Sequence, residues 1–244
     1  MCGRFVRASP ENVIRRAFGV TSAAPVDFRP RYNIAPGESV ATIVADGETA
    51  RPGEHSDGPR DERLGTRLGM IRWGLAPAAG SSAATVINAR SETAARRFRE
   101  SFVKRRCLIV ADGFYEWRRA GGIKIPHFFA LASRRPFGLA ALWDRTGPSR
   151  TPACAILTCS ANDLVAGVHD RMPVILDEKS AERWLDPAAR DRDLHPLLEP
   201  YPAAEMMGHS VSTLVNSTRN DSPDCIVPAA PVAEGTLRLV DKTD

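Results

Sequence analysis

Short apolar runs, separated by polar or turn residues, recur along the whole chain of 244 residues. The runs at residues 40–44, 107–111 and 153–159 have the length and the β-branched or small apolar composition of buried strands. No internal repeat is visible, and strands do not alternate regularly with long helical segments, which argues against a doubly wound parallel sheet. The pattern predicts an α+β fold: a single domain with a mostly antiparallel curved β-sheet or irregular barrel as its core, and a few short flanking helices.

The other strands follow from shorter apolar segments and turn signals. Asp112-Gly113 is a tight-turn dipeptide, so it predicts a hairpin that joins the strand at 107–111 to a paired strand at 114–117. Further strands are predicted at residues 70–75, 85–90, 126–132, 137–142, 173–176, 206–211 and 214–215.

The predicted helices are short. Ser9 suits the N-cap and Pro10 the first position of a helix that Gly19 ends. Further helices are predicted at residues 92–98, capped by Ser91, at 160–168 and at 177–185.

Two polar segments stand apart from this pattern. Residues 46–68 are rich in Gly, Asp, Glu and Arg, which predicts an exposed insertion loop. Residues 231–244 are interpreted as a C-terminal tail. The domain itself is expected to span residues 2–230.

Composition narrows the class of protein. No apolar stretch approaches the ~20 residues of a membrane span, and Arg4 and Arg7 interrupt any signal-peptide pattern. We therefore expect a cytoplasmic protein with no membrane segment. The five cysteines are an odd number without a CxxC pair, which predicts reduced thiols. No zinc-ligand spacing is present, and we expect neither a metal nor a cofactor.

The net charge of +4 permits a polyanionic partner without requiring one. Asn88 and Arg90 lie two apart on a predicted strand and so face the same side, where Arg can bind a phosphate. Other arginines that could join them are Arg4, Arg72 and Arg171. Trp73 and Trp117 offer flat faces for unpaired bases. The alternative is that these aromatic residues belong to the core.

Cys2 is the first candidate for covalent chemistry. Removal of Met1 would make it the N-terminal residue, with an α-amine and a thiol on one frame. These groups titrate near pH ~8 and ~8.5 in model peptides, so both have unprotonated fractions at neutral pH. Amine and thiol together close a five-membered thiazolidine on an aldehyde. The alternative is an ordinary thiol at a frayed terminus.

Glu116 and His169 are candidates for proton transfer. Glu116 sits among aromatic residues after an apolar run, and desolvation there would raise its pKa into the range useful for acid–base catalysis. It could instead point to solvent on the polar face of a hairpin. His169 precedes a predicted strand, and histidine is a common acid–base group, although a structural hydrogen-bonding role is the alternative.

Several motifs occur in one order along the chain. They are Met1-Cys2-Gly3-Arg4-Phe5, Arg31-Tyr32-Asn33-Ile34-Ala35-Pro36, Arg72-Trp73-Gly74-Leu75, Asn88-Ala89-Arg90-Ser91-Glu92-Thr93, Ala111-Asp112-Gly113-Phe114-Tyr115-Glu116-Trp117 and His169-Asp170-Arg171-Met172-Pro173. In these motifs the chain resembles the SRAP (SOS-response-associated peptidase) family, over roughly residues 2–230. The resemblance implies a sensor that crosslinks to abasic sites in single-stranded DNA, with a curved sheet and a basic groove.

The resemblance also implies site residues and partners. The nucleophile would be Cys2, and the other catalytic residues would be Asn88, Glu116 and His169. The implied DNA-binding residues are Arg4, Asn33, Arg72, Trp73, Arg90, Trp117 and Arg171. A monomer that acts on single-stranded DNA containing abasic sites is expected. The chain departs from the family at Ala76-Pro77-Ala78-Ala79, where a further tryptophan is usual, and at Val110, where proline is common.

The implied chemistry is a sequence of steps at one aldehyde. His169 and Glu116 would share the proton transfer that opens the sugar ring. The α-amine of Cys2 would then form a Schiff base, and its thiol would close the thiazolidine, while Asn88 holds the attack geometry.

Two other functions fit parts of the sequence. A non-covalent single-stranded DNA-binding module would need no reactive Cys2. An N-terminal-cysteine hydrolase, either a peptidase or a glutamine amidotransferase, would use Cys2 for hydrolysis. The amidotransferase alternative expects an Asn-Gly pair, and the chain contains no Asn-Gly dipeptide.

Overall fold

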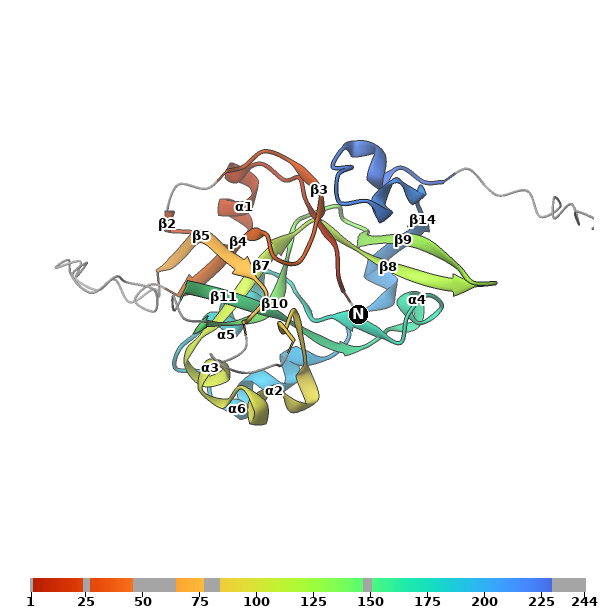
Figure 1. The fold of residues 1–244 in the computed structure, drawn as a ribbon. Helices are drawn as coiled ribbons and strands as arrows, with labels where there is room; N and C mark the ends of the chain where they lie inside the picture. Colours follow the sequence, from red (N-terminus) through yellow and green to blue (C-terminus); the bar gives the residue numbers. More distant parts are fainter. Residues whose placement is uncertain (1, 24–26, 46–64, 77–83, 147–150, 230–244) are drawn as a thin grey trace, which may run out of the picture.

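The computed structural model describes residues 2–23, 27–45, 65–76, 84–146 and 151–229 (Figure 1). The strands are β1 (Phe5–Arg7), β2 (Ser22–Ala23), β3 (Arg31–Ile34), β4 (Ser39–Ala45), β5 (Thr66–Trp73), β6 (Asn88–Arg90), β7 (Arg106–Ala111), β8 (Gly113–Ala120), β9 (Ile123–Leu131), β10 (Phe137–Thr146), β11 (Thr151–Ser160), β12 (Arg171–Pro173), β13 (Ile175–Leu176) and β14 (Met206–Ser210). The helices are α1 (Glu11–Ala17), α2 (Ser91–Arg97), α3 (Arg99–Lys104), α4 (Asp163–Ala166), α5 (Glu178–Leu185) and α6 (Asp191–Leu194), with 3-10 turns at His195–Leu198, Ala203–Glu205, Thr213–Asn216 and Pro223–Ile226.

Two curved sheets form the fold. In the described residues, one sheet has the order β14-β9-β8-β1-β3 and the other the order β12-β11-β10-β7-β4-β5-β2. Most neighbouring strands are antiparallel, but β11 runs parallel to β5 and β6, and β2 runs parallel to β5. The predicted α+β fold with a mostly antiparallel curved sheet is confirmed. The short parallel pairing of β11 with β5 also brings the two ends of the path β11-β10-β7-β4-β5 together.

The chain passes from one sheet to the other at Asp112, and this crossing contradicts the predicted hairpin. β7 pairs with β4 and β10, whereas β8 pairs with β1 and β9. The carboxylate of Asp112 accepts hydrogen bonds from the backbone N–H groups of Ala8 and Ser9. These bonds hold the segment that follows β1 against the point where the chain passes between the sheets. Gly113 is required there, because a Cβ would approach the ring of Phe128 to 2.2 Å.

Several predicted boundaries are wrong for identifiable reasons. Pro10, not Ser9, is the N-cap of α1, because the Ser9 hydroxyl donates to Asp112 instead. Arg90 rather than Ser91 precedes α2. The predicted strand at residues 214–215 is a 3-10 turn. Residues 66–68, assigned to the insertion loop, begin β5. Positions 46–64 and the tail lie outside the described residues.

Most other elements form where the sequence predicts them. β4, β10 and β11 cover the predicted strands at 40–44, 137–142 and 153–159. The predicted helix at 177–185 is α5, and the Asp177 side chain caps it by accepting from the N–H of Ser180 at 2.8 Å. The predicted strand at 173–176 is divided between β12 and β13.

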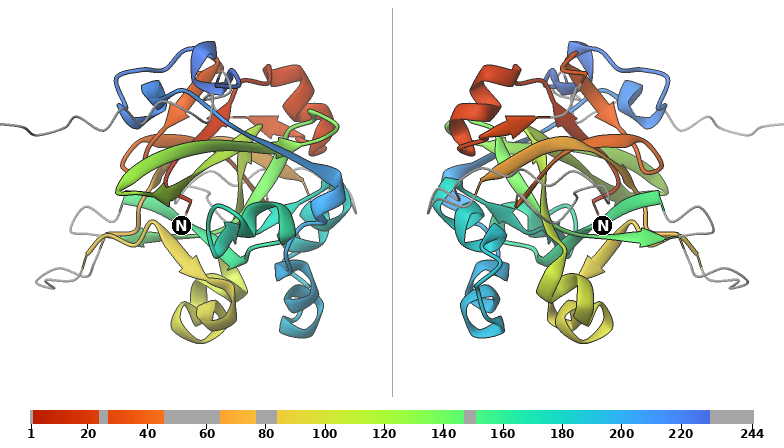
Figure 2. Two further views of the ribbon diagram at one scale, coloured as in Figure 1. Left: turned by 90° about the vertical axis from the view of Figure 1, so that its right-hand side faces the viewer. Right: turned by 90° about the vertical axis from the view of Figure 1, so that its left-hand side faces the viewer.

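The helices lie on different sides of the sheets, and the chain start lies near the middle. Figures 1 and 2 show α2, α3, α5 and α6 below the sheets and α1 above them. The buried guanidinium of Arg106 joins α3 and α5 to β7, because it donates to the carbonyl groups of Phe102 and Trp184. No helix among the described segments is long and apolar enough to cross a membrane.

Candidate functional site

The segment before β1 is held inside the molecule by Asn88. Cys2 has no exposed surface. The side-chain amide of Asn88, at the start of β6, donates to the backbone carbonyl of Cys2 at 2.8 Å. β6 is itself fixed because it pairs in parallel with β11, where Asn88 is in register with Ile156. The amide of Asn88 therefore sets the position of the Cys2 backbone.

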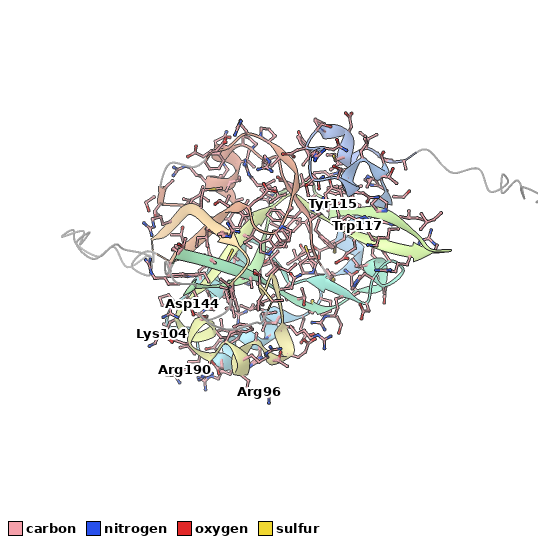
Figure 3. All side chains as sticks on the ribbon, in the orientation of Figure 1. Arg96, Lys104, Tyr115, Trp117, Asp144 and Arg190 are labelled. Atoms are coloured by element: carbon pink, nitrogen blue, oxygen red, sulfur yellow. The ribbon has the colours of Figure 1, made fainter. Side chains whose placement is uncertain are left out.

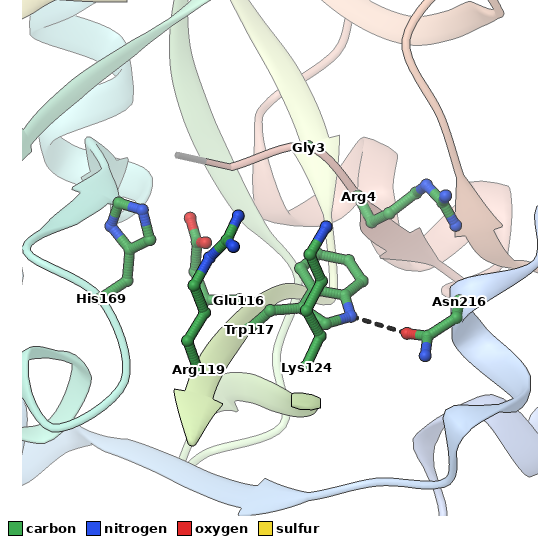
Figure 4. Close-up of a pocket in the computed structure, with 8 residues that line it drawn as sticks. All are labelled: Gly3, Arg4, Glu116, Trp117, Arg119, Lys124, His169 and Asn216. Atoms are coloured by element: carbon green, nitrogen blue, oxygen red, sulfur yellow. Dashed lines mark hydrogen bonds between the residues drawn. The ribbon is translucent and has the colours of Figure 1, made fainter. Parts of the chain in front are cut away.

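Glu116 reaches the same region from β8. The N–H of Tyr115 donates to the carbonyl of Arg4 at 3.0 Å, and this contact places Glu116 beside the chain start. The side chain of Glu116 is 2% exposed. Glu116 and His169 line one cavity of about 480 Å³, which Gly3 and Arg4 also line (Figure 4).

Burial changes the pKa of both the Glu116 carboxyl group and the Cys2 thiol. Burial raises the pKa of Glu116 to about 7, although the positive charge of the amino terminus opposes this shift. At neutral pH, Glu116 can therefore both give and take a proton. Burial also raises the pKa of the Cys2 thiol well above its ordinary range, and the charge of Glu116 raises it further. The thiol is therefore protonated at rest.

His169 is oriented by the backbone of the next strand. Its Nδ1 lies 3.0 Å from the N–H of Arg171, which donates to it. Nδ1 also lies 2.9 Å from a carboxylate oxygen of Asp170, a contact that needs a proton on Nδ1. Burial lowers the pKa of His169, which favours the neutral ring. In that form Nδ1 accepts from Arg171 and the proton is on Nε2.

The arginines predicted to bind DNA have different environments. Arg171 is held by both carboxylate oxygens of Glu92, at 2.6 and 3.0 Å, and also donates to the carbonyl of Thr158. Arg4 lines the cavity but donates to internal acceptors. Arg72 and Arg90 are exposed and do not line the cavity.

Of the two tryptophans expected to stack on bases, only Trp117 lies at the cavity. Trp117 is half-buried, and its indole N–H donates to the side chain of Asn216 at 2.7 Å (Figure 4). The prediction for Trp73 is wrong: this residue has no exposed surface, donates to the carbonyl of Ile87 and packs on Phe5 with ring centroids 5.4 Å apart. A ring covered on both faces cannot stack on a base.

Asn33, also expected to contact DNA, is an internal connector. It is fully buried, and its side-chain oxygen accepts from Arg4 at 2.7 Å. Its amide donates to the carbonyl groups of Val215, Ser217 and Asn220. The prediction of a DNA contact is wrong, because the oxygen of the carboxamide is committed to Arg4 and its amide group to the segment that carries Asn216.

Asn33→Ala is expected to lower the free energy of unfolding by about 3 kcal/mol, because it leaves several buried partners without hydrogen bonds. Urea denaturation followed by circular dichroism measures this loss. The exposed Asn12 is the matched control, and Asn12→Ala is expected to change stability by less than about 0.5 kcal/mol. A loss below about 1 kcal/mol for Asn33→Ala would contradict the connector role.

The structure adds residues that the sequence analysis missed. Arg119, Lys124 and Asn216 line the cavity with Glu116. The alternation of β8 was the available signal, because it places Arg119 on the same side as Trp117. The basic segments of α2 and α3 lie elsewhere: Figure 3 shows Arg96 and Lys104 well separated from Trp117.

Comparisons with known proteins agree on one family. The profile of "SOS response associated peptidase (SRAP)" matches residues 1–218. The chain is 38% identical to abasic site processing protein YoqW of Bacillus subtilis (strain 168), over 93% of this chain and 99% of that protein. It is 32% identical to abasic site processing protein HMCES of Gallus gallus, over 82% and 67% of the two chains. A crystal structure of a protein from Bacteroides thetaiotaomicron has the same fold, with a TM-score of 0.72 at 21% identity, and covers 94% of this chain and 100% of that one.

Proposed function

The chain belongs to the SOS response associated peptidase (SRAP) family, and from this premise we propose that it senses abasic sites in single-stranded DNA and bonds to them covalently through Cys2. The product is a thiazolidine that shields the lesion, and the protein acts as a monomer on cytoplasmic DNA. The names of the relatives, abasic site processing proteins, support this substrate. The observation that carries the proposal is the position of Cys2, held by Asn88 beside the cavity of Glu116 and His169.

The first step exposes an aldehyde. An abasic sugar is mostly a closed hemiacetal, so its C1′ hydroxyl must lose a proton while the ring oxygen gains one. Glu116, with its pKa raised to about 7, takes the first proton and supplies the second. His169 faces the same cavity with Nε2 carrying a proton, and it shares this transfer.

The amine then acts before the thiol. The α-amine of Cys2 attacks C1′, and loss of one water gives the Schiff base. The thiol adds to the imine carbon, and its proton passes to the nitrogen as the thiazolidine closes. The raised pKa of the buried thiol supports this order, because a protonated thiol is a weak nucleophile and the Schiff base, once protonated on nitrogen, has a more electrophilic carbon than the aldehyde. Asn88 keeps the backbone of Cys2 in place throughout.

Release of Met1 is a condition of this chemistry. While the peptide bond to Met1 exists, the nitrogen of Cys2 is an amide and cannot form a Schiff base. We therefore propose that the peptidase activity in the family name corresponds, in this chain, to removal of its own Met1. The intact mass of the purified protein is expected to lack one methionine.

The proposed function is tested by mixing the protein with single-stranded DNA that carries one central abasic site. We expect an adduct that survives heating on a denaturing gel, with a mass equal to the sum of both molecules less one water. The same strand without the lesion, and one with a tetrahydrofuran site that has no aldehyde, are expected to give none.

Each alternative function has its own result in this experiment. Equal binding of all three strands with no adduct would favour a non-covalent DNA-binding module. Hydrolysis of glutamine or of peptides with no adduct would favour an N-terminal-cysteine hydrolase. Either result would overturn the crosslinking proposal.

A further inference from the structure

The hairpin of β8 and β9 extends past the proposed catalytic residues and carries two cations to the same cavity. Arg119 and Lys124 are directly opposite each other in the antiparallel pairing of these strands. Both line the cavity of Glu116 and His169, and Figure 4 shows their side chains beside Glu116 and Trp117. The cavity therefore continues from the reacting groups onto a basic surface.

Arg119 and Lys124 have no ion-pair partner among the residues that the structure describes. Like charges directly opposite on neighbouring strands are destabilising. Arg31, by contrast, pairs with Glu38, and Arg105 pairs with Glu100. Glu116 lines the same cavity, and Asp170, whose charge acts on Glu116, lies against His169.

Arg4, which also lines the cavity, and Arg171, whose backbone contacts His169, are already engaged. Arg4 donates to Asn33 and to the carbonyl of Val215, and Arg171 is held by Glu92. Their guanidinium groups are thus tied to the protein, while Arg119 and Lys124 remain available to an outside anion. Trp117 stands beside them, fixed by its hydrogen bond to Asn216.

We infer that Arg119 and Lys124 form a phosphate subsite for the DNA strand next to the abasic sugar. This inference rests on the proposed function, which brings the sugar to Cys2. Phosphodiester groups then flank the sugar on both sides, and they are the anions that a nucleic acid presents to a basic surface. Arg119 and Lys124 hold the backbone beside the lesion so that C1′ stays at the reacting groups.

The subsite is tested by non-covalent binding, which does not depend on the crosslink. The probe is single-stranded DNA with a central tetrahydrofuran site, and its affinity is measured against salt concentration. Each phosphate contact on a single strand contributes about 0.7 to the slope of log affinity against log salt. Arg119→Gln and Lys124→Gln are each expected to reduce the slope by about 0.7, and the double variant by about 1.4, with roughly tenfold weaker binding at low salt.

Arg118→Gln is the matched control. Arg118 is an exposed cation on the same strand, but it does not line the cavity. We expect Arg118→Gln to leave the slope of log affinity against log salt close to that of the unaltered protein. Lys124→Arg is likewise expected to retain the full slope. Equal losses for Arg118→Gln and Arg119→Gln, or an unchanged slope in the double variant, would overturn the subsite. Absence of the covalent adduct in the unaltered protein would instead overturn the proposed function. It would not change the salt slopes, because they are measured on non-covalent binding.

Discussion

Cys2→Ala is expected to abolish the heat-stable adduct with abasic single-stranded DNA, with a rate at least about a thousandfold below that of the unaltered protein. The variant keeps an α-amine after Met1 is removed, but it has no thiol to add to the imine carbon. A Schiff base alone returns to aldehyde and amine in water. The measurement is the adduct band on a denaturing gel after heating, followed over time.

Cys2→Ser separates the two halves of the chemistry. It keeps the amine and replaces the thiol by a weaker nucleophile, so we expect no heat-stable adduct without a reductant. With borohydride present, reduction of the Schiff base is expected to give a stable amine adduct. If Cys2→Ser gave no adduct even with borohydride, the amine-first order would be wrong.

Cys159→Ala is the matched control for loss of a buried thiol. Cys159 lies on β11 and is 3% exposed, so this change also removes sulfur from a closed environment. We expect the adduct to form at the unaltered rate. An undiminished adduct from Cys2→Ala, or an equal loss from Cys159→Ala, would show that Cys2 is not the reacting residue.

The sequence predicts strands well where the physical signal is local. An apolar run such as that of β11 has to be buried on both faces, whatever its partners are. α5 likewise has its cap, Asp177, within its own sequence. The predicted hairpin at Asp112-Gly113 is wrong because the turn signal is local, whereas the partners of its strands are distant in the sequence. β7 pairs with β10, and β8 pairs with β1.

The site residues divide in the same way. Cys2, Glu116 and His169 are candidates because of their own chemistry and Asn88 because of the family resemblance, and the four residues lie around one region. Trp73 could not be assigned correctly, because an aromatic residue on a strand does not reveal whether its face is covered. The role of Asn33 depends on a segment nearly two hundred positions along the chain, so no local pattern could show it.

Glu116→Gln is expected to slow adduct formation by about a hundredfold or more, because the amide cannot take the proton from the C1′ hydroxyl. Non-covalent binding of the tetrahydrofuran strand is expected to be unchanged. In the unaltered protein the adduct rate should change around pH 7, where Glu116 titrates. The variant should lack that change.

The same substitution is expected to stabilise the fold at alkaline pH. The pKa of Glu116 is about 7 in the folded protein against 4.5 for the ordinary side chain. The folded state therefore favours the protonated form, and the stability this gives is complete below pH 4.5 and is lost as pH rises through 7. Above that pH, burial of the ionised carboxylate costs up to about 3 kcal/mol, which the neutral amide avoids.

Glu116→Gln should thus gain stability over the unaltered protein at pH 8 and lose this advantage at pH 4, as measured by urea denaturation at both values. Glu100→Gln is the control, because Glu100 is an exposed carboxylate paired with Arg105, and it should alter neither stability nor adduct rate appreciably. A variant that is both slower and more stable would mean that Glu116 is kept at a cost to the fold because its chemistry requires it. If Glu116→Gln were destabilising at pH 8, the carboxylate would instead be a structural partner, and the acid–base role would have to pass to His169.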